Sequence, residues 1–285
     1  MRTADNRVIS VLSQYREQLG DLYPEGEVKA IARSVFQELL GWDMSQMEIR
    51  KFESLSESDL LKVYLPLKRL RAGEPVQHVL GQVYFHGLHL RVTPDVLIPR
   101  PETEELVELI INSGYVPTRV VDIGTGSGCI ALALKQKFPE ARVLGVDVSE
   151  AALIVAAGNG SQNDLQVEWG HADVLDASFS LPAGTDLVVS NPPYIPRSEQ
   201  ETLASHVRAR EPHVALFAPD EDPVLSYRTI ATIAFASLPK GGQLWFEGHW
   251  KYASSVGALL TSIGFASVEV VKDLSGNDRF IHAVR

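Results

Sequence analysis

The chain has 285 residues, of which 45% are hydrophobic and 22% are charged, a composition typical of a soluble globular protein. The net charge of −10 falls entirely in residues 101–285, and no basic run is present, which argues against a DNA or RNA substrate. No apolar run approaches the ~18 residues that span a bilayer, the N-terminus lacks the apolar core of a signal peptide, and a single cysteine, Cys129, excludes an internal disulfide and favours a cytoplasmic setting.

Residues 5–72 show helical spacing and few strand signals. Apolar residues recur at three- and four-residue intervals in two segments: Val8, Leu12, Tyr15 and Leu19, and then Val28, Ile31, Val35 and Leu39. Gly20 and Gly41 interrupt these patterns, and Ser56 is typical of a further helix start. We therefore predict a small helical domain over residues 1–75, which either recognises a substrate or is a packing appendage that does not touch it.

Residues 76–100 change character and predict a β-hairpin connector. Apolar and aromatic residues gather around Val83-Tyr84-Phe85, and Gly81 and Gly87 provide the breaks. His86 and His89 lie in this segment without a cysteine or carboxylate cluster beside them. We expect exposed hairpin histidines there rather than metal ligands.

From residue 101 onward, strand and helix patterns alternate, which predicts one α/β domain over residues 101–285 with a parallel, doubly wound sheet. The candidate strands are 120–123, 143–147, 166–169, 186–190, 243–247, 268–271 and 280–284, and the candidate helices are about 102–112, 128–137, 149–157, 223–237 and 251–262. In such a sheet the ligand lies beyond the carboxyl ends of the strands, near the switch in strand order.

A glycine-rich loop, Asp122-Ile-Gly-Thr-Gly-Ser-Gly128, follows the first of these strands. Glycines permit a tight turn and a close backbone approach to a ligand. Gly126-Ser-Gly128-Cys-Ile-Ala131 fits the relaxed dinucleotide pattern, and Asp147 lies about 20 positions further on, where an acid meets a ribose. These features favour NAD, but the loop equally suits S-adenosylmethionine, so the loop alone leaves both cofactors open.

The strand over 186–190 ends in Ser190-Asn-Pro-Pro-Tyr194. Proline fixes φ and donates no hydrogen bond, so the carbonyls of Asn191 and Pro192 are free to accept from a ligand. The Asn191 side chain adds an acceptor, and Tyr194 adds a flat aromatic face. This cluster favours binding of a planar group that carries NH₂.

Together these motifs resemble those of the glutamine-N5 protein methyltransferases that modify peptide-chain release factors, the HemK-type family. The resemblance covers nearly the whole chain and rests on Val96-Leu-Ile-Pro-Arg-Pro-Glu-Thr-Glu104, the glycine loop, Ser190-Asn-Pro-Pro-Tyr-Ile195, Glu211-Pro-x-x-Ala-Leu216, Phe246-Glu247 and Asn277-Asp-Arg279. It implies S-adenosylmethionine as cofactor and an α/β fold: a seven-stranded, doubly wound, Rossmann-like methyltransferase sheet with a smaller N-terminal helical domain.

The resemblance also implies roles for individual residues. Gly124, Thr125, Gly126, Ser127 and Gly128 would line the methionine end of the cofactor, Asp147 would bind the ribose, Asp173 and Val174 would flank the adenine, and Arg100, Pro101, Glu102 and Thr103 would close over the cofactor from the connector. Asn191, which also belongs to the cofactor site, would hold the target amide together with the Pro192 carbonyl, and Pro193 and Tyr194 would lie beside the amide plane. His206 and His213 are expected to be loop residues and not bases.

The implied partner is a class I peptide-chain release factor, whose target glutamine lies in a Gly-Gly-Gln motif, with no membrane and no direct nucleic-acid substrate. Two alternatives stay open: an adenine-N6 methyltransferase acting on DNA or RNA, which shares Asn-Pro-Pro-Tyr, and a catalytically silent cofactor-binding scaffold. One departure from the family is Phe217-Ala-Pro-Asp-Glu-Asp222, which stands where a glycine-rich segment is usual and leaves that loop's conformation open. Gly241-Gly-Gln243 is interpreted as a turn before a strand, not as a self-methylation site.

Overall fold

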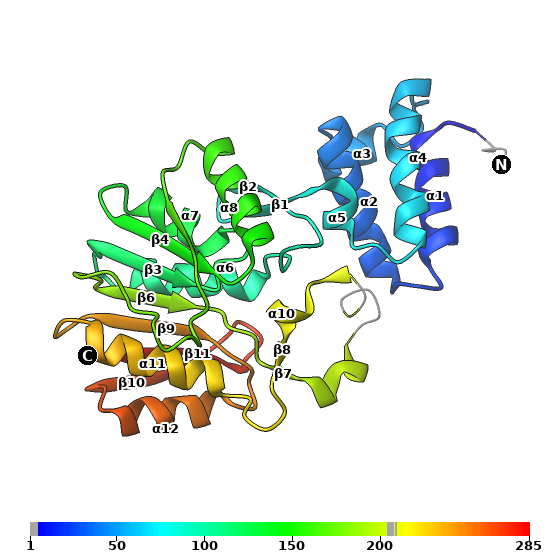
Figure 1. Ribbon diagram of the computed structural model, residues 1–285. Helices are drawn as coiled ribbons and strands as arrows, with labels where there is room; N and C mark the ends of the chain where they lie inside the picture. Colours follow the sequence, from blue (N-terminus) through cyan, green and yellow to red (C-terminus); the bar gives the residue numbers. More distant parts are fainter. Residues whose placement is uncertain (1–4, 204–207, 209) are drawn as a thin grey trace. The chain divides into compact units, whose positions relative to one another are not determined.

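Figure 1 shows the computed structural model, which describes residues 5–203, 208 and 210–285. The chain divides into two compact units. The helical unit comprises Met1–Gly81 and Ser205–Arg210, and the sheet unit comprises Gln82–Ala204 and Glu211–Arg285. Within the described residues, no helix is both long and apolar enough to cross a membrane.

The helical unit is built on buried apolar stripes. Its helices are α1 (Val8–Leu19), α2 (Glu25–Leu40), α3 (Met44–Ile49), α4 (Glu57–Arg71) and α5 (Val76–Leu80). Tyr15, Val35 and Phe36 are fully buried in its core, and the Tyr15 hydroxyl donates to the Val63 carbonyl. The Ser56 hydroxyl accepts from the Asp59 N–H and caps α4, as its spacing indicates. The expectation of a smaller helical domain at the N-terminus is confirmed.

The segment 76–100 is only partly the hairpin that the sequence indicates. Residues 76–80 form helix α5, which ends at the left-handed Gly81, and the hairpin is limited to β1 (Gln82–Phe85) and β2 (Leu88–Arg91). His89 is exposed, whereas His86 is half-buried, with Nε2 3.2 Å from the Glu108 carboxylate. No group of three potential metal ligands occurs in the described part of the chain.

The sheet unit contains a seven-stranded sheet in the order β10-β11-β9-β6-β3-β4-β5 (Figure 1). The strands are β3 (Arg119–Ile123), β4 (Arg142–Asp147), β5 (Glu168–His171), β6 (Leu187–Ser190), β9 (Gln243–Glu247), β10 (Ser267–Lys272) and β11 (Asp278–Val284). The expectation of a wholly parallel sheet is wrong at one strand, because β11 is antiparallel to both neighbours. The link from β10 to β11 is too short for a parallel crossover, so these strands form a hairpin.

Helices cover both faces of the sheet, as expected for a doubly wound fold (Figure 1). They are α6 (Pro101–Asn112), α7 (Cys129–Lys137), α8 (Glu150–Gln162), α11 (Leu225–Ser237) and α12 (Ala253–Ile263). Neighbouring residues of β3 show the two layers: Val120 packs with α6 and α7, and Val121 packs with α11 and α12. The Rossmann-like α/β class is confirmed.

The segment between β6 and α11 carries short elements that the sequence did not predict. They are β7 (Ile195–Pro196), the 3₁₀ helix η1 (Arg197–Thr202), α10 (His213–Leu216) and β8 (Phe217–Ala218). β8 pairs in parallel with β7, so Phe217 and Ala218 of the atypical loop are buried. Gln243 is the first residue of β9. Its side chain is buried, and its Oε1 accepts from Trp245 Nε1 at 2.8 Å, in keeping with a structural role.

Candidate active site

A cavity of about 270 Å³ opens at the carboxyl ends of β3, β4 and β6, where the strand order reverses. This is the position that a doubly wound sheet provides for a ligand. Its lining comprises Asp95, Val96, Leu97, Ile123, Gly124, Gly126, Val146, Asp147, Val148, Ser149, Ala152, Ala172, Asp173, Val174, Leu175, Ser190, Asn191, Pro192, Pro193, Pro212, Val214, Ala215, Ser226 and Ile230. The glycine loop and the β6 tip therefore meet at one site.

Only part of the predicted glycine-loop set lies on the cavity wall. Gly124 and Gly126 line it, both at positive φ (73° and 54°), and space is open where a Cβ would stand on either. Thr125 and Ser127 are buried behind them. Gly128 is also behind the wall, where a Cβ would stand 2.8 Å from the Trp169 ring, so glycine is required there for packing.

Asp122, near the end of β3, forms hydrogen bonds that hold the glycine-rich loop in place. Its carboxylate is fully buried, and Oδ2 accepts from Thr125 Oγ1 at 2.6 Å and from the Ala131 N–H at 3.2 Å. Oδ1 has no hydrogen-bond partner among the described residues. Burial raises the pKa of Asp122 to about 7. Asp122 is absent from the described cavity lining, so its role is to hold Thr125 and the start of α7 in place.

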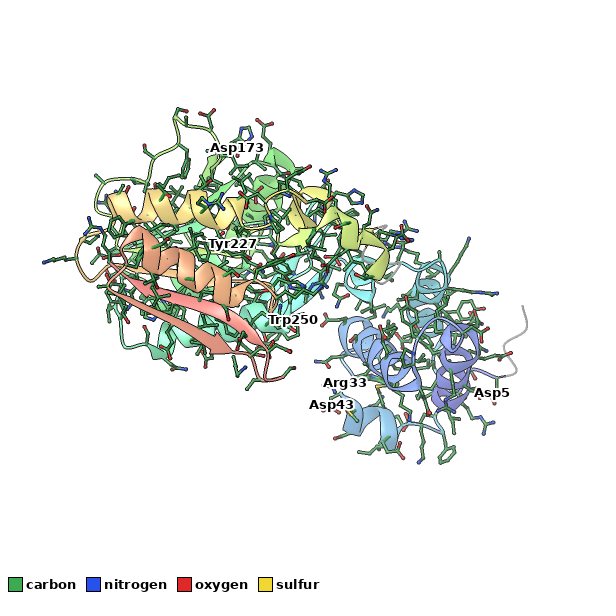
Figure 2. All side chains as sticks on the ribbon, turned by 90° about the horizontal axis from the view of Figure 1, so that it is seen from below. Asp5, Arg33, Asp43, Asp173, Tyr227 and Trp250 are labelled. Atoms are coloured by element: carbon green, nitrogen blue, oxygen red, sulfur yellow. The ribbon has the colours of Figure 1, made fainter. Side chains whose placement is uncertain are left out.

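Asp147 is held at the end of β4 by two backbone groups. Oδ1 accepts from the Ser149 N–H and Oδ2 from the Gly126 N–H, each at 2.9 Å. A carboxylate offers about four lone-pair sites, so capacity remains for two ligand hydroxyls. Asp173 lies on the loop after β5 (Figure 2), where its Oδ1 accepts from the Leu175 N–H at 2.8 Å. Asp147, Asp173 and Val174 all line the cavity.

The β6 tip places Asn191, Pro192 and Pro193 on the cavity wall. Tyr194 does not line the cavity; its half-buried ring packs beside His249, with centroids 5.8 Å apart. Burial raises the pKa of the Tyr194 hydroxyl well above its ordinary value, so this group stays neutral. The tip therefore brings residues that carry acceptor groups to the cavity wall, whereas its aromatic ring packs beside His249.

Behind Asn191 lies a buried polar chain that sequence reasoning did not find. Asn191 Nδ2 is 3.4 Å from Thr103 Oγ1, and Thr103 Oγ1 donates to Glu247 Oε2 at 2.7 Å. Thr103 and Glu247 are both buried. Thr103 thus faces Asn191 and Glu247 and is not part of the cavity wall.

Arg100 lies in an ion pair beside the cavity-lining segments. It is absent from the described cavity lining, and its guanidinium donates to Glu211 Oε1 at 2.6 Å. The preceding residues, Asp95–Leu97, reach the cavity instead. Pro101 and Glu102 are likewise absent from that lining.

Several apolar lining residues were not predicted. They come from α8, α10 and α11 and include Ala152, Val214, Ala215 and Ile230. In the sequence these residues cannot be distinguished from ordinary core positions, so no local signal marks them. His213 begins the short helix α10 and is not in a loop, whereas His206 lies outside the described residues.

Comparison with known proteins agrees with this site. A family model described as the methyltransferase small domain matches residues 102–210, and one described as the PrmC N-terminal domain matches residues 10–81. A solved methyltransferase from Pyrococcus furiosus, 18% identical, has a TM-score of 0.51 over 70% of this chain and 89% of its own, a likeness of fold. The fold and the site thus define a Rossmann-like methyltransferase.

Similarity along the whole chain identifies the family within this class. The release factor glutamine methyltransferase of Bacteroides thetaiotaomicron is 39% identical over 280 residues, 98% of this chain and 100% of its own length. The proteins of the same name from Flavobacterium psychrophilum and Chlorobaculum tepidum are 35% and 38% identical, over 94% and 89% of this chain and 96% and 89% of their own. The chain belongs to the release factor glutamine methyltransferase family.

Proposed function

We propose that this protein transfers a methyl group from S-adenosylmethionine to the side-chain amide nitrogen, N5, of the glutamine in the Gly-Gly-Gln motif of class I peptide-chain release factors. The observation that carries the proposal is the position of Asn191 and Pro192 on the wall of the cavity. A primary amide presents two N–H donors in one plane, and these residues supply two acceptors. The names of the relatives support the same substrate.

The residues around the cavity fit S-adenosylmethionine. Gly124 and Gly126 leave room for a ligand against their backbone, and Asp147 retains acceptors for two ribose hydroxyls. Asp173 and Val174 border the part of the cavity that we assign to the adenine. When bound, this cofactor supplies a methyl carbon on a positively charged sulfur, and the transfer forms an N–C bond as the C–S bond breaks and the nitrogen loses a proton.

An amide nitrogen is a poor nucleophile because its lone pair is delocalised into the carbonyl group. Acceptors at both N–H groups would aim the nitrogen and stabilise the positive charge that develops on it. Asn191 Oδ1 and the Pro192 carbonyl would therefore act through proximity and electrostatic preorganisation. Tyr194, whose hydroxyl stays neutral, would help to exclude water from the amide.

We assign recognition of the body of the release factor to the helical domain, residues 1–75, and we place the activity in the cytoplasm. The model match to the PrmC N-terminal domain over residues 10–81 supports a distinct role for this region. The acidic charge of residues 101–285 supports a protein substrate over a nucleic acid. We further infer that Arg100, through Glu211, acts on the cofactor site indirectly.

The test is transfer of a labelled methyl group from S-adenosylmethionine to three substrates under the same conditions. They are an intact class I release factor, the same factor with the Gly-Gly-Gln glutamine replaced by alanine, and double-stranded DNA. The proposal predicts label only in the unaltered factor. Label in DNA would favour the adenine-N6 alternative, and absence of label in all three would favour the silent scaffold.

A further inference from the structure

The orientation of the Asn191 amide decides whether that side chain can act as an acceptor. An asparagine side chain carries oxygen on one side and NH₂ on the other, and a half-turn about its last bond exchanges them. If Nδ2 faced the substrate, the substrate N–H groups would meet donors and would be repelled. The site therefore needs a device that fixes this amide in one orientation.

Thr103 supplies a hydrogen bond with a defined direction. Its hydroxyl has a single hydrogen, which it donates to Glu247 Oε2 at 2.7 Å. The same oxygen can then only accept, and Asn191 Nδ2 is the group that faces it, at 3.4 Å. Asn191 is also among the groups that lower the pKa of Glu247, which is the effect of its NH₂ side, so both neighbours favour that side of the amide.

Glu247, which accepts the Thr103 hydrogen bond, is itself held in place by its surroundings. It ends β9 and is 1% exposed, and its backbone carbonyl accepts from the hydroxyl of Tyr227, labelled in Figure 2, at 3.1 Å. Arg279, which donates to the Gly248 carbonyl at 3.1 Å, provides a nearby positive charge that favours the carboxylate. Thr103 lies in the first turn of α6 and is 3% exposed. Thr103 and Glu247, the two buried residues behind Asn191, are therefore shielded from water.

We propose that Thr103 and Glu247 are positioning residues that hold the Asn191 amide with Nδ2 toward the protein interior and Oδ1 toward the substrate nitrogen. The proposal rests on the proposed function, in which Asn191 accepts from the target amide. Neither residue lines the cavity among the described residues, so each acts through Asn191. Loss of the hydrogen bonds that join Asn191, Thr103 and Glu247 should lower turnover, while cofactor affinity stays close to that of the wild type.

The main test compares Thr103→Val, which keeps the shape but removes the hydroxyl, with Thr103→Ser, which keeps the hydroxyl. We expect Thr103→Val to lower kcat for methylation of the release factor by about 10- to 100-fold, the range seen when a partner that orients a functional group is removed. Thr103→Ser should recover most of this loss. Thr261→Val is the matched control, because Thr261 is an exposed helical threonine whose hydroxyl donates to the Gly257 carbonyl within α12.

A second readout needs no activity and so separates this proposal from the proposed function. The side-chain NH₂ of Asn191 can be followed by NMR in ¹⁵N-asparagine-labelled protein assigned with Asn191→Ala. We expect slow hydrogen exchange in the wild type and in Thr103→Ser, and faster exchange in Thr103→Val and Glu247→Gln. Thermal melting checks that each variant is folded.

The two readouts distinguish failure of the positioning role from failure of the proposed function. An unaltered kcat and unaltered exchange in a folded Thr103→Val would overturn the proposal, as would a Thr103→Ser variant as slow as Thr103→Val, since that pattern indicates packing. If Thr103→Val fails to fold, Glu247→Gln provides the same two readouts. A wild type that exchanges slowly at Asn191 but does not methylate release factor would support the fixed orientation and contradict the proposed function.

Discussion

Asn191 carries the proposed acceptor for the target amide on the wall of the cavity. Replacing it with alanine removes one of the two acceptors for the target amide but leaves the rest of the cavity wall in place. Loss of one preorganised catalytic hydrogen bond costs on the order of 10²–10³ in turnover. We expect Asn191→Ala to lose this much in kcat with a much smaller change in cofactor affinity, as measured by steady-state kinetics and calorimetry. Turnover above half of the wild-type value would contradict the acceptor role.

Asp147 tests the identity of the cofactor. In Asp147→Asn a single oxygen replaces two, and the new NH₂ faces one of the backbone N–H groups of Gly126 and Ser149. A lost hydrogen bond to a charged group is worth about 1.5–3 kcal/mol, so the Kd for S-adenosylmethionine should rise roughly 10- to 100-fold. Calorimetry measures this change, and thermal melting checks the fold. Tight binding of NAD to the wild type would contradict the cofactor assignment.

Because Glu247 is an ionisable group that helps to orient Asn191, we expect kcat to depend on pH. Burial raises its pKa to about 7, against the opposing effects of the Thr103 hydrogen bond and the positive charge of Arg279. Below that pH the protonated carboxyl group can donate to Thr103, which frees the hydroxyl to turn toward Asn191. The charged groups that face Glu247 are Arg279 and Glu102, and Tyr194 and Tyr227 are neutral neighbours.

We therefore expect kcat to fall as the pH drops below about 7 and to level off above it. Glu247→Gln cannot ionise, so its kcat should be lower and should lose this step. Single-turnover rates at saturating cofactor provide the measurement, with Glu269→Gln on the exposed face of β10 as a control. An identical step in Glu247→Gln would assign the titration to another group.

The sequence predicts the groups next to the ligand far better than the groups behind them. Short motifs of a few consecutive residues contain Gly124, Gly126 and Asn191, so their chemistry can be predicted from the local sequence. The contact between Thr103 and Glu247 joins positions 144 apart in the chain, and only the fold brings them together. Thr125, Ser127 and Gly128 share the motif but are absent from the described cavity lining, so the motif alone does not tell which of its residues reach the cavity.

At the level of elements, Glu211 joins two walls of the cavity. Its buried carboxylate accepts from the Ile98 N–H at 3.2 Å and from Arg100 at 2.6 Å. The first contact lies next to Asp95–Leu97, and Glu211 itself precedes Pro212 and α10, so both connected segments line the cavity. This arrangement gives a physical reason for two of the sequence motifs, Ile-Pro-Arg-Pro and Glu-Pro, to occur in one chain.

Glu211→Ala should therefore loosen both walls. It leaves a buried N–H and a half-buried guanidinium without their partner, which we expect to cost about 2–3 kcal/mol of unfolding free energy. The Kd for S-adenosylmethionine should rise with little change in kcat at saturating cofactor. Denaturant unfolding and calorimetry measure the two effects, with Glu25→Ala, from an exposed pair with Lys29, as the control. Unchanged cofactor affinity would show that the pair serves stability alone.

Element type was predictable where a local pattern was strong. The strands on both sides of the cavity are buried apolar runs bounded by glycine or a polar residue, and β9 matches its expected bounds. Helix α5 was missed because five residues with apolar Val76 and Val79 suit a helix or a strand equally. The reversal of β11 was missed because strand direction depends on the length of the link, not on the strand's own residues.

At the level of the whole molecule, the net charge is unevenly distributed along the chain. Residues 1–100 carry equal numbers of acidic and basic side chains, whereas residues 101–285 carry the whole net charge. A glutamine in a loop offers little area for binding, so affinity for the whole release factor must come from elsewhere. Contacts made by residues 1–75 would raise the effective concentration of the loop at the active site.

Deletion of residues 1–75 tests this division. We expect methylation of an intact release factor to fall sharply, because the second contact is lost. Methylation of a short Gly-Gly-Gln peptide, already slow, should fall far less. Both rates are measured with labelled cofactor, and circular dichroism checks that the truncated protein is folded. Equal losses on both substrates would mean that residues 1–75 support the fold or the active site and do not recognise the partner.

The central claim, that the accepting atom is the side-chain nitrogen of one glutamine, is tested most directly by tandem mass spectrometry. A class I release factor is incubated with the protein and S-adenosylmethionine and then digested. We expect one added methyl group, located on the glutamine of the Gly-Gly-Gln peptide and absent when Asn191→Ala replaces the wild type. A methyl group on any other residue, or an unmodified factor beside methylated adenine in DNA, would contradict it.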